Sequence, residues 1–102
     1  MSVTSKASSD GKSVEIAIRG RFDFSVQQQF RDAYRDQEKP GLKFIVNLAE
    51  VEYMDSAALG MLMVLKKYAD KMSGGVVLKR PPQAIKRILL TAKFDKIFTI
   101  EE

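Results

Sequence analysis

The sequence contains no cysteine and no histidine among its 102 residues. Without cysteine there is no disulfide framework and no thiol nucleophile. Without histidine, most zinc sites, every Ser-His-Asp triad and the usual general base are excluded. We therefore expect that the protein is not an enzyme and that it carries neither a metal nor another cofactor.

Long hydrophobic runs are also lacking. No apolar stretch approaches the roughly 18 residues that indicate a membrane span, and the opening residues MSVTSKASSDGK contain no hydrophobic signal core. We therefore expect a cytoplasmic protein without a membrane part. The composition, with 45% apolar and 29% charged residues, is that of an ordinary globular protein, and the length predicts one domain over residues 1–102.

A dense run of basic residues is absent as well, although the net charge is +4. A basic stripe would be the electrostatic footprint of a nucleic-acid binder. Here the basic residues are scattered, mostly in pairs such as Arg19/Arg21, Lys66/Lys67, Lys79/Arg80 and Lys86/Arg87. This pattern is typical of a solvated, mildly basic surface, and no nucleic-acid partner is expected.

The hydrophobic pattern predicts strands and helices that alternate along the chain. Asp10-Gly11 is a turn signal between residues 2–8 and 13–19, which predicts an opening hairpin. The run LKFIVNL is nearly continuous and rich in β-branched and aromatic residues, which predicts a central strand covered on both faces. Helical spacing and the Gly and Pro signals predict helices over residues 24–39, 56–72 and 83–92, a strand VVLK and a last strand or turn in DKIFTI.

This order predicts an α/β fold, with a mostly parallel sheet of four to five strands and helices packed on it. The opening hairpin adds an antiparallel strand. In such sheets the connections that follow the carboxyl ends of strands gather at one edge, where sites are usually built. Asp23 and Ser56 both lie in such connections, so we expect them to lie close together.

Three segments in order and spacing carry a family resemblance: GRFDF, FIVNLAEVEYMDSAALGML and PPQAIKRILLTAKFDKIFTI. Over essentially the whole chain they resemble the STAS domain, the fold shared by bacterial anti-sigma factor antagonists and the cytoplasmic tails of sulfate transporters. The most specific piece is the strand, short loop and Asp-Ser pair before a helix that carries Gly60. The transporter tails are the poorer match, because this chain has no membrane part.

The resemblance implies a partner-switching protein in bacterial signal transduction. In the family, the serine that matches Ser56 is phosphorylated by a partner that is both a Bergerat-fold serine kinase and an anti-sigma factor, and a metal-dependent serine phosphatase reverses the modification. The unphosphorylated domain binds the partner and frees the sigma factor. Asp23 matches the acid near that serine, and Asp55 matches the acid before it. The expected outputs are transcription, a stress pathway, or surface attachment such as biofilm formation or motility.

Three positions depart from the family pattern. Ala57 stands where the family often has a second serine, Ala58 where it has a glycine, and Asn47 where it has an aspartate. The first departure leaves Ser56 as the only hydroxyl at the start of the helix. The last weakens the acidic cluster, so no bound nucleotide is expected.

Ser56 has two interpretations. A serine at this place is commonly a helix cap, which contributes about 1 kcal/mol. Asp55 is the better cap, because an acid also meets the positive end of the helix dipole, and Ser56 would then keep a free hydroxyl that can accept a phosphoryl group. The alternative to a switch is a constitutive STAS-like assembly subunit, such as that of a bacterial lipid-transport ATPase complex, in which Ser56 is only a cap.

The helix that begins at Ser56 has two stripes. The inner stripe, predicted to face the sheet, consists of Ala58, Leu62, Leu65, Ala69 and Met72. The second stripe, predicted to bind the partner, consists of Ser56, Gly60, Met63 and Lys67. A glycine inside a helix costs about 1 kcal/mol relative to alanine, which close approach of a partner backbone would explain.

Two of these assignments have structural alternatives. Gly60 and Met63 are either partner contacts or are packed by a neighbouring helix of the same domain. Asp23 either caps the helix that follows it or contacts the partner kinase. Asp55 and Ser56 complete the predicted partner-binding set.

Overall fold

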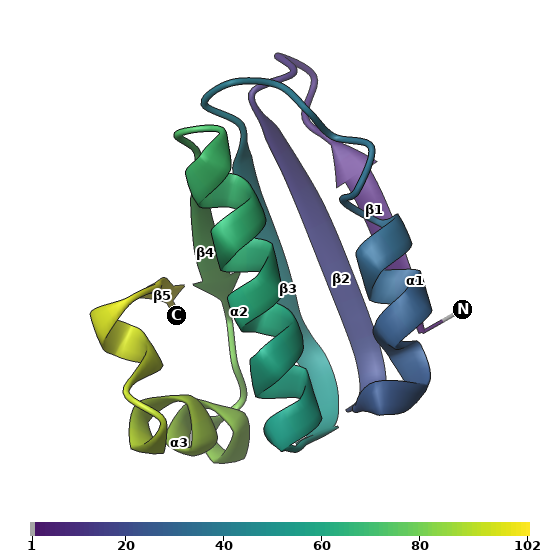
Figure 1. Ribbon diagram of the computed structural model, residues 1–102. Helices are drawn as coiled ribbons and strands as arrows, with labels where there is room; N and C mark the ends of the chain where they lie inside the picture. Colours follow the sequence, from purple (N-terminus) through teal and green to yellow (C-terminus); the bar gives the residue numbers. More distant parts are fainter. Residues whose placement is uncertain (1) are drawn as a thin grey trace.

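In the computed structural model, which describes residues 2–102, one sheet holds five strands in the order β1-β2-β3-β4-β5. The strands are β1 (Val3–Ala7), β2 (Ser13–Phe22), β3 (Lys43–Met54), β4 (Gly75–Lys79) and β5 (Thr99–Glu101). Strands β1 and β2 form an antiparallel hairpin, and the other neighbouring pairs are parallel (Figure 1). The predicted α/β fold with a mixed, mostly parallel sheet is therefore confirmed.

The helices of the described chain are α1 (Gln27–Asp32), α2 (Ser56–Lys71) and α3 (Gln83–Thr91), with short 3-10 turns η1 (Phe24–Val26) and η2 (Phe94–Lys96). The prediction for the first helix was wrong in length, because the helix ends at Asp32 and turns follow it. Beyond Tyr34 the segment RDQEK has no apolar side chain to bury. Most helical stability in proteins comes from packing an apolar face, so this segment has little to hold it helical.

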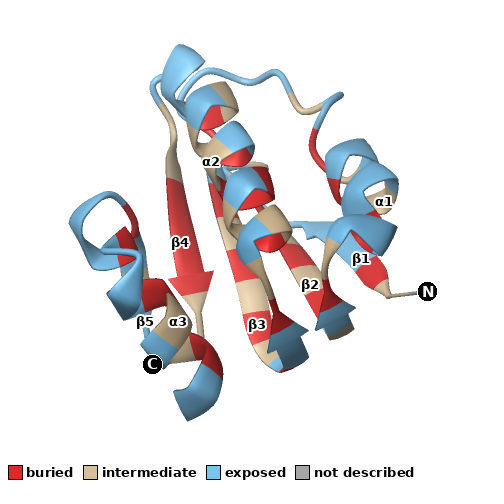
Figure 2. Ribbon diagram, turned by 60° about the horizontal axis from the view of Figure 1, so that its bottom comes forward, coloured by how far each residue is buried: buried red, intermediate tan, exposed pale blue. Residues whose placement is uncertain are grey.

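The core lies between the sheet and α1 and α2, which cover one face of it (Figure 1). On that face β2 and β3 contribute alternate side chains that are almost fully buried, namely Val14, Ile16, Ile18, Phe44, Val46 and Leu48. From α2 the predicted inner stripe meets them: Ala58, Leu62, Leu65 and Ala69 are 0% exposed, and Met72 is half-buried. Figure 2 shows these buried positions along the central strands and α2.

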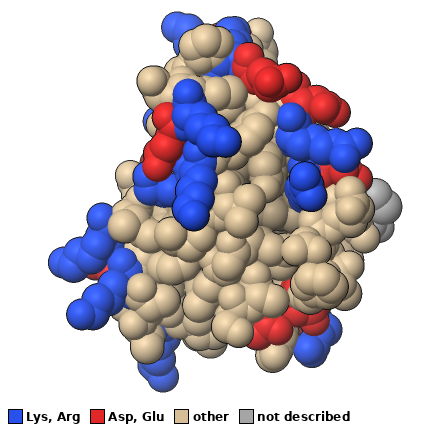
Figure 3. Space-filling model, viewed as in Figure 1, with Lys and Arg blue, Asp and Glu red and all other residues tan. Residues whose placement is uncertain are grey.

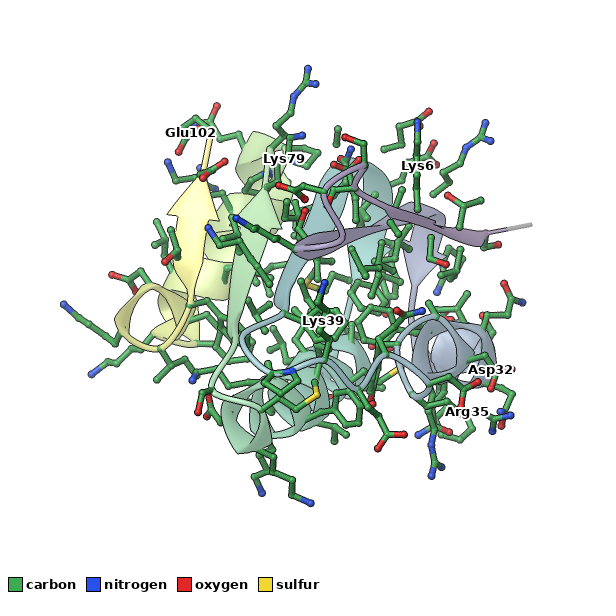
Figure 4. The ribbon with its side chains drawn as sticks, turned by 90° about the horizontal axis from the view of Figure 1, so that it is seen from above. Lys6, Asp32, Arg35, Lys39, Lys79 and Glu102 are labelled. Carbon is green, nitrogen blue, oxygen red and sulfur yellow. The ribbon has the colours of Figure 1, made fainter. Side chains whose placement is uncertain are left out.

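The prediction that the central strand is covered on both faces was wrong for β3. Ile45 and Asn47 alternate with the buried residues and are only half-buried, because α1 and α2 both lie on the opposite face. Asn47 donates to Glu15 at 3.2 Å, and the Lys79 ammonium lies 3.3 Å from the same carboxylate. Seen from above, Lys6 and Lys79 lie across the sheet from α1 (Figure 4). The open face is therefore held by polar contacts.

Two adjacent glycines test how tightly the α2–β4 turn packs on the start of β3. A Cβ on Gly74 would lie 2.0 Å from the backbone oxygen of Leu42, whereas one on Gly75 would meet nothing within 4 Å. We expect Gly74→Ala to lower the free energy of unfolding by about 1–3 kcal/mol, the usual cost of overpacking. The matched control Gly75→Ala should change it by less than about 0.5 kcal/mol, measured by urea unfolding. Equal stabilities for the two variants would contradict this packing.

Candidate partner-binding site

The connections after β2 and β3 lie at the same edge of the sheet, at the lower end of the molecule in Figure 1. Phe22 and Met54 are register partners in the parallel pair, so Asp23 and Asp55 each lie one residue beyond a paired position. The two segments are built alike, because each passes from a buried residue through an aspartate into a helical turn. The register confirms the expectation that the two connections are neighbours.

Asp55 is the cap of α2. Its Oδ1 accepts a hydrogen bond from the Ala58 amide at 3.2 Å, and its backbone is extended, as an N-cap requires. Ser56 is therefore the first helical residue, and it is exposed. Its hydroxyl makes no hydrogen bond to any residue between 2 and 102. The cap function and the free hydroxyl thus fall on two different residues.

Asp23 caps η1, as one of its two predicted roles requires. Its Oδ1 accepts from the Ser25 amide at 3.0 Å and from the Ser25 hydroxyl at 2.5 Å, while Oδ2 accepts from the Arg21 Nε at 3.0 Å. The Ser25 hydroxyl, helped by Arg21 and the Ser25 amide, holds the pKa of Asp23 below its ordinary value. The carboxylate is therefore ionised at neutral pH, and three hydrogen bonds hold it in place.

Two exposed aromatic side chains lie at this edge, and neither is among the site residues predicted from the sequence. Phe24, directly after Asp23, is 67% exposed, and Tyr53, two residues before Asp55, is 40% exposed. The Arg21 guanidinium lies 4.0 Å from the centre of the Tyr53 ring, in the geometry of a cation–π contact. Arg21 and Tyr53 are register partners, so the β2–β3 pairing creates this contact. The available signal in the sequence was a second aromatic residue two positions after the buried Phe22.

The outer side of α2 continues the site away from the sheet edge. Ser56, Gly60 and Lys67 are exposed, and a Cβ on Gly60 would meet nothing within 4 Å. Packing of Gly60 by a neighbouring helix, one of its two predicted explanations, therefore does not occur among residues 2–102. Met63 differs, because it is half-buried and packs against the core.

Val64 is the exposed apolar residue of this side of α2. Its side chain is 56% exposed, and it lies one turn beyond Gly60. Val64 is not among the partner-binding residues predicted from the sequence, although its spacing of four residues from Gly60 was visible there. The structure thus brings Ser56, Gly60, Val64 and Lys67 onto one solvent-facing side.

Two findings about the described residues concern metal sites and membrane-spanning helices. Within it, no group of three or more acidic residues is placed to hold a metal ion. Asn47, where the family pattern has an aspartate, is engaged with Glu15 on the open face of the sheet. Among residues 2–102, no helix has the length and apolar character needed to cross a membrane.

An α/β domain with a mixed sheet and an Asp-Ser helix start at the carboxyl edge of its strands defines the class of the protein. A family model described as "Mlab, STAS domain" matches residues 5–100. A STAS-domain containing protein of Pseudomonas aeruginosa (strain UCBPP-PA14) is 36% identical over 100 residues, which cover 98% of this chain and 99% of the relative. The chain belongs to the STAS domain family, and the resemblance seen in the sequence is confirmed.

Solved structures show the same fold. A crystal structure of a Thermotoga maritima protein named as an anti-sigma factor antagonist superposes with a TM-score of 0.81 at 21% identity, over 98% of this chain and 86% of that one. The anti-sigma factor antagonist SpoIIAA in its unphosphorylated form superposes with a TM-score of 0.74 at 15% identity, over 98% and 87% of the two chains. At such identities the likeness establishes the fold.

The hydrogen bonds of Asp23 predict how its carboxyl titrates. Ser25→Ala removes the largest cause of its lowered pKa, so we expect that pKa to rise toward the ordinary value of about 3.9 in an NMR carbon titration. Because the pKa is lower in the folded than in the unfolded chain, the ionised carboxylate stabilises the fold at neutral pH, and this contribution is lost as pH falls through the folded pKa. The control Ser9→Ala, in the exposed hairpin turn, should leave the titration unchanged. An unaltered Asp23 titration in Ser25→Ala would show that this bond does not set the pKa.

Proposed function

We propose that this protein is a phosphorylation-controlled partner switch of the anti-sigma factor antagonist class. It binds an anti-sigma factor that is also a serine kinase of the Bergerat-fold type when Ser56 is unphosphorylated, and releases it when Ser56 carries phosphate. The observation that carries the proposal is that capping and the free hydroxyl fall on two different residues at the start of α2. Asp55 caps the helix, which leaves the exposed Ser56 hydroxyl free to act as a phosphoryl acceptor.

The position of Ser56 determines whether a phosphate mainly lowers the stability of the domain or its affinity for the partner. A phosphate adds about −1.5 to −2 charge, and the positive end of the α2 dipole favours an anion there. Repulsion from Asp55 opposes this gain, so the isolated domain loses little stability. The cost falls on the complex, because a partner surface shaped for a neutral hydroxyl would bury a doubly charged group without matching cations.

The proposed partner surface combines the sheet edge with the outer side of α2. Asp23, Asp55 and Ser56 lie at the centre, and Gly60, Met63 and Lys67 extend it along the helix. We add Phe24, Tyr53 and Arg21, because exposed aromatic and arginine side chains are the usual anchors of protein interfaces. Gly60 provides room for a partner backbone to approach α2.

The covalent chemistry belongs to the partners. The kinase adds the phosphate to Ser56, a metal-dependent serine phosphatase removes it, and the domain itself binds and releases. The regulated output is transcription through a sigma factor, or a stress or biofilm programme controlled in the same way. The fold likeness to proteins named as anti-sigma factor antagonists supports this class.

A constitutive assembly subunit is the second candidate, because the matching family model is described as "Mlab, STAS domain" and not as an anti-sigma factor antagonist. In such a subunit Ser56 would carry no phosphate under any condition. Phosphopeptide mass spectrometry of the native protein, across growth and stress conditions, separates the two functions. Phosphate on Ser56 supports the switch, and its absence throughout supports the assembly subunit.

Variants of Ser56 test the sign of the switch. After a pull-down from native lysate identifies the kinase partner, Ser56→Ala should bind it constitutively, while Ser56→Asp and Ser56→Glu should bind more than about a hundredfold more weakly, equivalent to about 3 kcal/mol. Binding is measured by calorimetry with Ser9→Asp as the charge-matched control. Each acidic variant should melt within a few degrees of the wild type. Tight binding by the acidic variants would reject the switch, and their unfolding would reject an interface effect.

Gly60 tests whether the outer side of α2 is in the interface. Gly60→Leu should raise the free energy of unfolding by up to about 1 kcal/mol, because leucine favours helix and its Cβ meets no neighbour. The same variant should weaken binding to the identified partner by about 1–3 kcal/mol, and Gly60→Ala by less. Met63→Asp is a poorer test, because burial against the core makes a loss of stability the expected result. Normal binding by Gly60→Leu would remove this position from the interface.

A further inference from the structure

A groove runs between α1 and α2, on the helical side of the molecule. It encloses about 470 Å³. Its floor is apolar and largely aromatic, formed by Phe30, Tyr34, Met61 and Tyr68. Val64 stands at its edge with 56% of its surface exposed. Nothing in the proposed switch uses this floor.

One polar group of the lining, the Tyr68 hydroxyl, is already hydrogen-bonded. The Tyr68 hydroxyl lies 2.8 Å from the backbone oxygen of Arg35 and 3.0 Å from that of Gln37, and it donates to these carbonyls. The hydroxyl therefore pins the turn after α1 to α2. Recognition in the groove then depends on its apolar shape and on the charges at its rims.

Basic side chains lie on both sides of the groove. Arg31 and Arg35 are part of its lining on the α1 side, and the exposed Lys71, which is outside the lining, follows Val64 on α2 by seven residues. Arg35 pairs with Asp32 at 3.4 Å, but no carboxylate of residues 2–102 lies within ion-pair distance of Arg31 or Lys71. Figure 3 shows two groups of basic side chains on either side of a band without charge.

The nearby acids do not neutralise these rims. Asp70 on α2 is held by Lys66 at 2.9 Å, and Asp32 on α1 already serves Arg35 and Gln28. Burial raises the pKa of Tyr68, and the charges of Glu38 and Asp36 raise it further, so these two acids lie near the Tyr68 end of the groove floor. Arg31 and Lys71 therefore have no ion-pair partner among residues 2–102, and the acids without a partner lie near Tyr68.

We infer that this groove binds an acidic amphipathic helix of a partner protein. Met61, Val64 and Tyr68 lie along one side of α2 and give the groove an apolar wall, and an amphipathic helix binds by laying its own apolar face into such a groove. Carboxylates flanking that face would pair with Arg31 on one side and with Lys71 on the other. Neutralising those cations gives this occupant an advantage over an uncharged or basic helix.

The groove acts separately from the switch. Tyr68 follows Ser56 by twelve residues, which is about 18 Å along a helix. That distance exceeds the screening length of about 8 Å at physiological salt, so a phosphate on Ser56 does not change the electrostatic potential at the Tyr68 end of the groove. One partner therefore stays held at the groove while another is exchanged at Ser56.

The experiment is selection from a display library of helical peptides of about 18 residues, long enough to form a helix, with the full chain as bait. Enriched peptides should be amphipathic and acidic, and their binding, measured by fluorescence polarisation, should weaken as salt is raised. Val64→Glu should weaken it at least tenfold, and the double variant Arg31→Glu, Arg35→Glu should enrich basic peptides instead. The control Arg87→Glu, on the exposed side of α3, and Ser56→Asp should both bind as the wild type does.

Other outcomes overturn the inference. Enrichment of basic or uncharged peptides, no enrichment, or binding that Val64→Glu leaves intact would reject the acidic helix. Oleate that binds the groove where no peptide does would make the occupant a small apolar anion. A wild-type dimer that Val64→Glu converts to a monomer, seen by light scattering, would make the occupant a second copy of this chain. Loss of peptide binding in Ser56→Asp would show that the groove and the switch surface are one site.

Discussion

The parallel pairing of β2 and β3 is the constraint on which the rest of the molecule depends. Because Phe22 and Met54 are partners at the ends of their strands, both chains leave the sheet at one edge and each turns into a helix there. The same pairing stacks Arg21 on Tyr53. It also sends α1 and α2 back along one face of the sheet, which buries the core and creates the groove between the two helices.

At that edge the capping bonds are made by aspartates, which leaves Ser56 without a capping role. Each helix start needs an acceptor for its free amides, and an aspartate supplies it in both connections. Because Asp55 makes the capping bond, Ser56 lies inside the first turn, exposed and unbonded, at the place where a helix best accommodates added negative charge. The proposed phosphate on Ser56 would change the surface of the domain and leave its core untouched.

The two functional surfaces proposed for this chain share α2 but use different sides of it. The switch surface joins the first turns of α2 to the sheet edge, where Phe24 and Tyr53 are exposed. The groove uses the side that faces α1, where Met61 and Tyr68 form its floor. One 16-residue helix with a buried inner stripe thus serves both surfaces, because three of its sides have distinct neighbours.

The sequence by itself determined the order of elements, the mixed sheet and the inner stripe of α2, because hydrophobic periodicity and cap residues are local signals. The family followed from the resemblance of three segments to the STAS domain. Which residue makes the cap at Asp55-Ser56 was a choice between neighbours that backbone geometry settled. Only the tertiary structure decided that β3 is covered on one face, that Met63 packs inward while Val64 points outward, and that Phe24 stays exposed. These outcomes depend on where α1 and α2 sit over the sheet, and such contacts between distant segments leave no periodic mark in the chain.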